Sequence, residues 1–164
     1  MTDAKTNVAT DAAARTITVS RTFAAPRERV FRAFTDPADL AHWWGPEGWQ
    51  TETLAHELVP GGVWRYVLRG PEGMESWCKA TYREVAPPER IVYRDEFLDK
   101  EGNTVAGLPT MVITVEFTEH DGKTAVTSAT RFASEEDLQQ VVAMGVAEGI
   151  TQTWERLATY LGGE

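Results

Sequence analysis

One carboxylate lies where the sequence could support proton chemistry. Residues 90–97, RIVYRDEF, are rich in β-branched and aromatic side chains and predict a strand. Alternate side chains share one face of a strand, so Asp95 lies on the face of Tyr93 and Phe97. If that face points into an apolar interior, burial raises the pKa of the carboxyl toward neutrality, as general acid–base catalysis requires. Asp95 is therefore our candidate catalytic residue, and a surface carboxylate paired with an arginine is the alternative.

The other reactive side chains form no recognisable site. His42, His56 and His120 are the only histidines and lack the spacing of metal ligands, so we expect no metal ion. The chain has no phosphate-binding loop, dinucleotide fingerprint or nucleophile elbow, so we expect no cofactor. We expect Cys78, the single cysteine, to be a small buried apolar residue rather than a nucleophile. The sequence alone therefore defines no complete catalytic set.

Composition excludes several classes of function. The chain has 164 residues, of which 42% are hydrophobic and 25% charged, as expected of one globular domain. A net charge of −9 with no basic cluster disfavours nucleic acids and anionic membranes as partners. No apolar run approaches the ~20 residues of a membrane span. Residues 1–15 lack the features of a signal peptide, and we expect them to form a flexible polar tail. We expect residues 16–164 to form a single domain. One cysteine fits a reducing cytoplasm, and the sequence leaves open whether the chain forms a homodimer.

The middle of the chain predicts a curved antiparallel sheet of about six to seven strands, because short segments of alternating polarity follow one another through brief turns. These segments are residues 16–23, 50–58, 63–69, 76–85, 90–97, 110–119 and 123–132. After the first of them, Pro26 and the N-cap candidate Asp36 predict two short helices. In the last segment, Ser128 and Thr130 share the inward face, where their hydroxyls either pair across strands or face a cavity.

The C-terminal segment predicts a long helix over residues 135–161, begun by Ser134 as N-cap and carrying one apolar stripe that must lie along the sheet. Gly145 and Gly149 lie one turn apart within it, and each costs about 1 kcal/mol relative to alanine. These glycines either let the backbone approach the sheet closely or leave space beside it.

Three tryptophans lie close together earlier in the chain. Trp43, Trp44 and Trp49 flank a glycine–proline loop and suggest the rim of a core or the mouth of a cavity.

The chain contains the motifs Phe23-x-Ala25-Pro26, Thr35-Asp36-Pro37, Trp43-Trp44-Gly45, Pro60-Gly61-Gly62-x-Trp64, and the run from Tyr82 to Arg90. Together these motifs resemble the bacterial relatives of the activator of heat-shock protein 90 ATPase, which belong to the START-like superfamily. The resemblance extends from about Thr16 to Leu161. It implies an α+β helix-grip fold, in which the sheet wraps around the long C-terminal helix.

This resemblance also implies a cavity between sheet and helix that holds an apolar small molecule. Its expected walls are Trp64, Tyr66, Cys78, Tyr82, Tyr93, Phe97, Met111, Ile113 and Val115, together with the hydroxyls of Ser128 and Thr130. The expected floor is Gly145, Gly149 and Thr153, and the expected entrance is Trp43, Trp44 and Trp49. Each of these residues could equally serve as ordinary core.

Three functions remain open on this reading. A carrier or sensor that binds an apolar or aromatic small molecule ranks first. A cofactor-independent enzyme resembling polyketide cyclases ranks second, since some relatives of this fold catalyse cyclisation or dehydration, with Asp95 in the catalytic role. A co-chaperone ranks last: the eukaryotic activator has an additional N-terminal domain, whereas only a short tail precedes Thr16 here, so we do not expect a chaperone partner.

Overall fold

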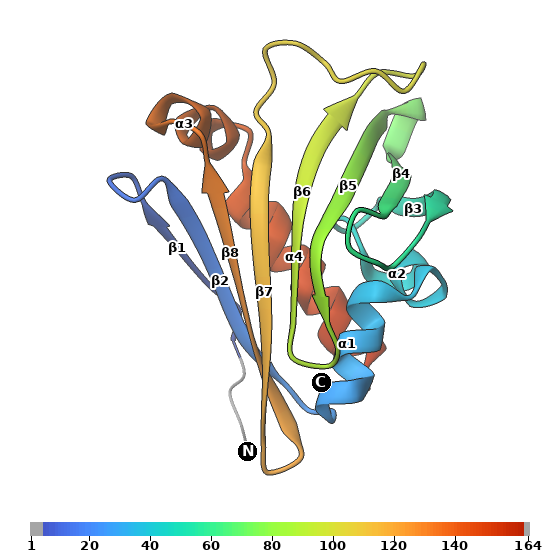
Figure 1. Ribbon diagram of the computed structural model, residues 1–164, viewed down its shortest axis with the longest axis vertical. Helices are drawn as coiled ribbons and strands as arrows, with labels where there is room; N and C mark the ends of the chain where they lie inside the picture. The colour runs from blue at the N-terminus through green and yellow to red at the C-terminus, as the bar shows by residue number, and fades with distance from the viewer. Residues whose placement is uncertain (1–4, 163–164) are drawn as a thin grey trace.

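The computed structural model describes residues 5–162 and shows an α+β chain (Figure 1). Its strands are β1 (Asn7–Asp11), β2 (Thr16–Phe23), β3 (Gln50–His56), β4 (Val63–Arg69), β5 (Glu75–Ala86), β6 (Arg90–Leu98), β7 (Met111–His120) and β8 (Lys123–Phe132). Its helices are α1 (Arg27–Thr35), α2 (Pro37–Trp43), α3 (Glu135–Ala143) and α4 (Val146–Tyr160). A short 3-10 turn, Pro71–Gly73, connects β4 to β5.

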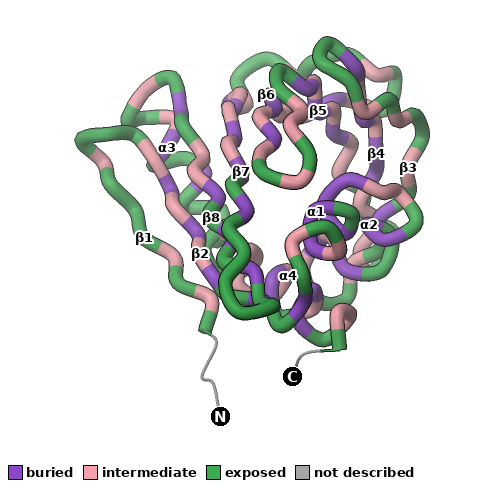
Figure 2. Tube along the Cα trace, turned by 60° about the horizontal axis from the view of Figure 1, so that its bottom comes forward, coloured by how far each residue is buried: buried purple, intermediate pink, exposed green. Residues whose placement is uncertain are grey.

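All described strands form one antiparallel sheet in the order β1-β2-β8-β7-β6-β5-β4-β3. In Figure 1 helix α4 crosses behind this sheet, with α1 and α2 toward its C-terminal end. Figure 2 shows the structure from another side, in which the sheet curves from β1 at one edge to β3 at the other, with the helices inside the curve. A curved antiparallel sheet around a C-terminal helix is the helix-grip fold, so the predicted architecture is confirmed.

The sheet has eight strands rather than the predicted six to seven. The additional strand is β1, which lies within the segment expected to be a tail and pairs with β2 through positions such as Val8 opposite Val19. Sequence reasoning missed it because its residues, NVATD, are mostly exposed and show no apolar alternation. Its position is set by main-chain pairing at the sheet edge, which leaves little signal in side-chain polarity.

The C-terminal helix is interrupted, which corrects the prediction of one helix over residues 135–161. Helix α3 begins at the predicted N-cap, where Ser134 Oγ accepts from the Asp137 amide at 3.1 Å. Gly145 then adopts a left-handed φ of 82° and becomes the N-cap of α4. Its amide donates to the Val142 carbonyl at 3.0 Å, closing the end of α3. A glycine takes this conformation without the strain that a Cβ would cause, so Gly145 marks a turn between two helices.

The two short helices after β2 are confirmed. Asp36 accepts from the Ala38 amide at 2.9 Å and caps α2, which starts at Pro37. Trp43 at the end of α2 is fully buried, and its indole N–H donates to the Ala33 carbonyl at 2.9 Å. This bond fastens α2 to α1. No helix within residues 5–162 has the length and apolar character needed to cross a membrane.

An aromatic cluster fills one part of the space inside the curved sheet. Phe34 of α1 makes edge-on contacts with Trp43, Phe117 and Trp154, with ring centroids 4.9, 5.3 and 5.9 Å away. These side chains join α1, α2, β7 and α4 into a close-packed core. The space between the sheet and the α3–α4 junction is not filled and contains a cavity.

Candidate functional site

A cavity of about 360 Å³ lies between the inner face of the sheet and α4. The strand side is lined by Ile17, Val19, Tyr66, Leu68, Ser76, Cys78, Tyr93, Asp95, Phe97, Met111, Ile113, Ser128, Thr130 and Phe132. The helix and loop side is lined by Trp44, Gly45, Pro46, Val141, Met144, Gly145, Val146, Gly149, Ile150, Thr153 and Trp154. Apolar and aromatic groups dominate this lining, with a small number of polar groups among them, as is usual for small-molecule sites.

Two glycines leave room on the helix side of the cavity. A Cβ atom built on Gly145 would have no heavy atom within 4 Å, and one on Gly149 would meet only Pro46 Cγ at 3.8 Å. These glycines are therefore not required for close backbone contact, and the absence of their side chains opens the space. The Thr153 hydroxyl, one turn on, donates to the Gly149 carbonyl at 2.8 Å.

Aromatic side chains form one wall. The rings of Trp64 and Tyr66 stack with centroids 3.8 Å apart, and Trp44 meets both rings edge-on at 5.3 and 6.3 Å. Trp44 and Tyr66 line the cavity directly. Trp64 lies behind them, with its indole N–H donating to Thr53 Oγ1 at 3.0 Å. The stack holds the Tyr66 ring in one orientation, so its hydroxyl is fixed toward the cavity.

Asp95 points into this cavity together with Tyr93 and Phe97, as the strand alternation predicts. The Tyr66 hydroxyl lies 3.3 Å from Asp95 Oδ1 and 3.4 Å from Oδ2 and donates to the carboxylate. Among residues 5–162, no lysine, arginine or histidine lines the cavity. Burial raises the pKa of Asp95 from 3.8 to about 7; the hydrogen bonds from Tyr66 and from the Glu96 amide oppose the rise, and the Glu96 charge adds to it. Asp95 can therefore gain or lose a proton near neutral pH.

Cys78 lies beside this pair and is buried. Its position in β5 is opposite Tyr66 on β4 and Phe97 on β6. Burial, with the nearby Asp95 charge, raises the pKa of its thiol to about 12. A thiol with that pKa stays protonated at neutral pH, so Cys78 offers a small apolar surface and no thiolate nucleophile.

The cavity collects most of the residues expected from the sequence. Those that line it are Trp44, Tyr66, Cys78, Tyr93, Asp95, Phe97, Met111, Ile113, Ser128, Thr130, Gly145, Gly149 and Thr153. The others do not line it: Trp43, Trp49, Trp64, Tyr82 and Val115. Trp43 and Val115 are buried in the core, and Trp49 packs on Gly70, where an added Cβ would lie 2.6 Å from the indole. Trp64 and Tyr82 line an adjoining crevice of only about 10 Å³.

Some lining residues were missed by the sequence reasoning. Ile17 and Val19 of β2 and Ile150 and Trp154 of α4 complete the apolar wall. The strand alternation and the helical stripe predicted that these side chains face inward. Those patterns could not distinguish an inward side chain that touches another side chain from one that faces empty space. Cavity and core have the same sequence signature, because both need apolar surface.

A guanidinium group that sequence reasoning also missed fixes the loop at the cavity rim. Arg156 of α4 donates through Nη1 to the carbonyls of Gly45 at 2.8 Å, Pro46 at 3.1 Å and Trp49 at 3.1 Å. Its Nη2 donates to the His42 carbonyl at 3.3 Å. The loop after α2 therefore lies tethered to α4, with Gly45 and Pro46 at the cavity. No sequence motif links an arginine to carbonyl groups more than a hundred residues away.

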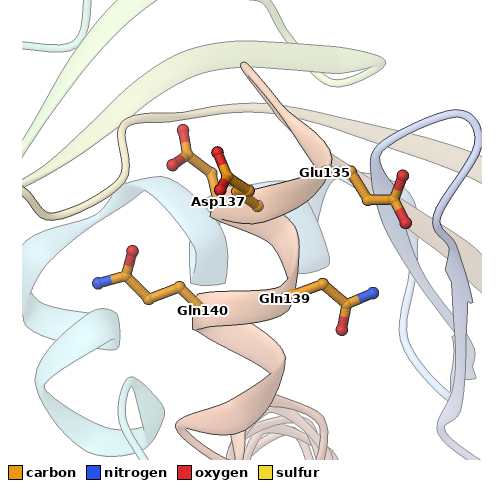
Figure 3. A pocket seen from close by; sticks show the side chains of 5 residues that line it. Glu135, Asp137, Gln139 and Gln140 are labelled. Atoms are coloured by element: carbon orange, nitrogen blue, oxygen red, sulfur yellow. The ribbon is translucent and has the colours of Figure 1, made fainter.

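A second hollow lies on the surface of α3, at its first turns (Figure 3). Glu135 and Gln139 point to one side of the helix and Gln140 to the other, so these side chains do not converge on a common point. Within residues 5–162, no cluster of three or more His, Cys, Asp and Glu side chains could hold a metal ion. This hollow therefore offers neither enclosure nor a ligand set, and the internal cavity is the better candidate site.

The fold defines a helix-grip protein, with a cavity between the sheet and α4. Residues 24–162 match the family model described as Activator of Hsp90 ATPase homolog 1-like protein, and the chain belongs to this family. None of the curated proteins compared with the chain matches it.

Solved structures with the same fold come from several bacteria. A protein from Mycobacterium smegmatis is 34% identical, with 94% of this chain and 95% of that chain covered and a TM-score of 0.88. A protein from Arthrobacter aurescens is 28% identical, with 96% and 92% covered and a TM-score of 0.92. A protein from Staphylococcus epidermidis is 34% identical, with 90% of each chain covered and a TM-score of 0.80. These likenesses establish family and fold, and function has to be argued from the site.

Proposed function

We propose that this protein binds an apolar or aromatic small molecule in the cavity between the sheet and α4. The observation that carries the proposal is the partly open cavity of about 360 Å³ with a largely apolar lining. This volume lies at the small end of the ~300–1,000 Å³ range of ligand pockets. A compact ring system with few polar groups fits such a space better than a long lipid does.

The energetics of the helix side support this proposal. Gly149 lies inside α4, where a glycine costs about 1 kcal/mol relative to alanine. Space is available for a larger side chain at this position, since an added Cβ would make only one ordinary contact. An unfilled cavity also loses the packing contacts that stabilise a core. A bound ligand would restore those contacts, and Gly149 would then serve to leave room for it.

Native mass spectrometry of the freshly purified protein tests the proposal. We expect an extra mass on the native protein that disappears when the same sample is denatured. The variant Gly149→Leu places a side chain in the cavity and serves as the matched sample that should carry no extra mass. A clean mass for both samples, together with no binding of added aromatic compounds, would contradict ligand binding.

A second candidate function is proton-transfer catalysis on the bound molecule, favoured by a single observation. Asp95 faces the cavity, and burial places its pKa at about 7, near the value that suits a general acid or base. Carrier and enzyme differ in whether the ligand leaves chemically changed. If a turnover reaction is found, Asp95→Asn should abolish it without loss of binding, and unchanged turnover would remove Asp95 from the mechanism.

The family description refers to activation of the Hsp90 ATPase, and this remains our third candidate. The proposed site is an internal cavity rather than a protein-docking surface, so we do not propose a chaperone partner. Measuring the ATPase rate of Hsp90 with and without this protein tests whether the chaperone function should rank below ligand binding. A clear acceleration of the ATPase would place the chaperone function first.

We propose a cytoplasmic location, where the single Cys78 would stay reduced.

A further inference from the structure

The cavity contains one acidic side chain and no basic one. Asp95 is the sole aspartate or glutamate among its lining residues, and no lysine, arginine or histidine in the described chain lines it. Buried carboxylates in proteins are normally paired with a cation, because an unpaired charge is costly to remove from water. Asp95, which is half-buried at the cavity wall, has only the Tyr66 hydroxyl within hydrogen-bond distance among the side chains of residues 5–162.

The groups that face Asp95 from neighbouring elements cannot supply the missing charge. Tyr66 on β4, Cys78 and Tyr82 on β5, and Tyr93 on β6 all have a raised pKa, because burial and the Asp95 charge both disfavour their ionised forms. They are neutral near pH 7. Glu96, the next residue on β6, is also a carboxylate and increases the negative potential at Asp95.

Strands β7 and β8 and helices α3 and α4 also contribute no cation to the site. Their lining residues are uncharged: Met111, Ile113, Ser128, Thr130, Phe132, Val141, Val146, Gly149, Ile150, Thr153 and Trp154. The site therefore has a net negative charge whenever Asp95 is ionised. A cation bound in the cavity would compensate that charge.

Aromatic rings surround the same region. Trp44, Tyr66, Tyr93 and Phe97 line the cavity, and their ring faces carry the negative electrostatic potential that attracts cations. Aromatic walls with one carboxylate match a molecule that combines an apolar body with a positive head. The chain as a whole also has a net charge of −9, which attracts cations and repels anions.

We propose that the molecule bound in this cavity is a lipophilic amine whose protonated nitrogen pairs with Asp95 while its apolar body fills the remaining space. This inference rests on the proposed ligand binding and specifies its chemical class. An ammonium group donates to the carboxylate and offsets its unpaired charge. A neutral carbonyl compound, which would accept from protonated Asp95, is the competing class, and repulsion from ionised Asp95 disfavours a carboxylate.

Three probes with the same ring system distinguish these classes. We would titrate 1-naphthylmethylamine, 1-naphthalenemethanol and 1-naphthaleneacetate into the protein by isothermal titration calorimetry at pH 8. The amine should bind at least about tenfold more tightly than the alcohol, since hydrogen bonds to charged partners are the stronger kind. The carboxylate should bind most weakly.

The variant Asp95→Asn keeps the shape of the side chain and removes its charge, so it should reduce the preference for the amine to about threefold or less. Asp121→Asn is the matched control, because it makes the same change in net charge in an exposed turn. The Asp121 variant should keep the full preference. Equal loss of the preference in both variants would overturn the pairing with Asp95.

A proton-release measurement needs no variant. Because Asp95 is mostly protonated at pH 6, binding of the amine should displace up to about one proton, seen as a heat that depends on the ionisation enthalpy of the buffer. Amine affinity should rise about tenfold between pH 6 and pH 8, and that of the alcohol should not rise.

The outcomes separate the two proposals. If the alcohol binds as tightly as the amine, or if Asp95→Asn keeps the full preference for the amine, the amine proposal is overturned and ligand binding stands. If none of the three probes binds and the native mass is clean, the proposed function is overturned as well.

Discussion

Tyr66 donates its hydroxyl to Asp95 across an intervening strand. The two residues belong to β4 and β6, with β5 between them, and the Tyr66 oxygen lies 3.3 Å from Asp95 Oδ1. The reach is possible because both side chains lie on the inner face of the sheet and tyrosine is long; the Tyr66 ring also stacks on Trp64. This bond is the main side-chain interaction that stabilises the ionised form of Asp95, and burial opposes it.

Removing the Tyr66 hydroxyl should therefore raise the pKa of Asp95 further. In Tyr66→Phe the carboxylate loses a donor while its burial is unchanged, so we expect a pKa above the native value of about 7. Titration of the Asp95 side-chain carbon by NMR measures this shift. Trp64→Phe is a useful comparison, because it disturbs the stack and leaves the hydroxyl in place. A pKa that falls in Tyr66→Phe would contradict this account of the site.

Stability should depend on pH through Asp95. The folded protein binds the proton more tightly than the unfolded chain, whose ordinary aspartate pKa is 3.8. Its contribution is fully present below about pH 4, is lost as pH rises toward about 7, and is constant above that. The loss is at most about 1.4 kcal/mol per pH unit within this window.

Asp95→Asn should remove that dependence. Its free energy of unfolding, measured in urea from pH 4 to pH 8, should increase relative to the native protein as the pH rises. Asp121→Asn should show a much smaller trend, since the side chains of Asp121 and of its ion-pair partner His120 are both highly exposed. A difference between Asp95→Asn and the native protein that stays constant with pH would show that the Asp95 pKa is not raised by folding.

Substitutions at Gly149 should separate stability from binding. Gly149→Ala adds a methyl group in ordinary contact with Pro46, 3.8 Å away, and should stabilise the protein by up to about 1 kcal/mol. Gly149→Leu extends a side chain into the cavity, where it occupies space that the naphthalene probes need. It should weaken their binding by tenfold or more, which is about 1.4 kcal/mol of binding free energy. Thermal unfolding and calorimetry measure the two effects. Gly145 is unsuitable for this test, because its φ of 82° strains any other residue.

Removing the hydrogen bonds of the Arg156 guanidinium to the loop after α2 should make this loop, at the rim of the cavity, more mobile. Arg156→Lys keeps the charge but cannot reach several carbonyl groups at once, so we expect a loss of about 1–2 kcal/mol of stability. Amide hydrogen exchange should become faster at Trp49, whose amide donates to the Pro46 carbonyl at 3.1 Å within this loop. Arg131→Lys, at an exposed position on β8, is the control. Equal exchange in the two variants would mean that the loop is held by other contacts.

Much of the fold could be predicted from the sequence. The alternation along residues 90–97 predicted that Asp95 shares a face with Tyr93 and Phe97, and the three side chains do line one cavity. Asp36 and Ser134 were identified as N-caps, and both accept the expected amide hydrogen bonds. These features depend on local periodicity and on capping chemistry, which a short stretch of sequence contains in full.

The two errors in the predicted secondary structure occur where the tertiary structure departs from what the local polarity pattern indicates. The apolar stripe continues through Gly145, so periodicity alone predicts one helix where the chain makes a turn. The strand Asn7–Asp11 has no apolar face and is held by main-chain pairing with β2. In both cases the deciding factor is a backbone conformation or a partner strand that side-chain polarity does not report.

The sequence by itself determined the family, the order of most elements and which side chains face inward. Only the tertiary structure decided which inward side chains touch one another and which face empty space. It also decided that Asp95 has Tyr66 as its side-chain partner, that no cation among residues 5–162 lines the cavity, and that Arg156 holds the rim loop from α4. Periodicity reports the direction of a side chain, whereas a cavity and its electrostatics depend on distances between residues far apart in the chain.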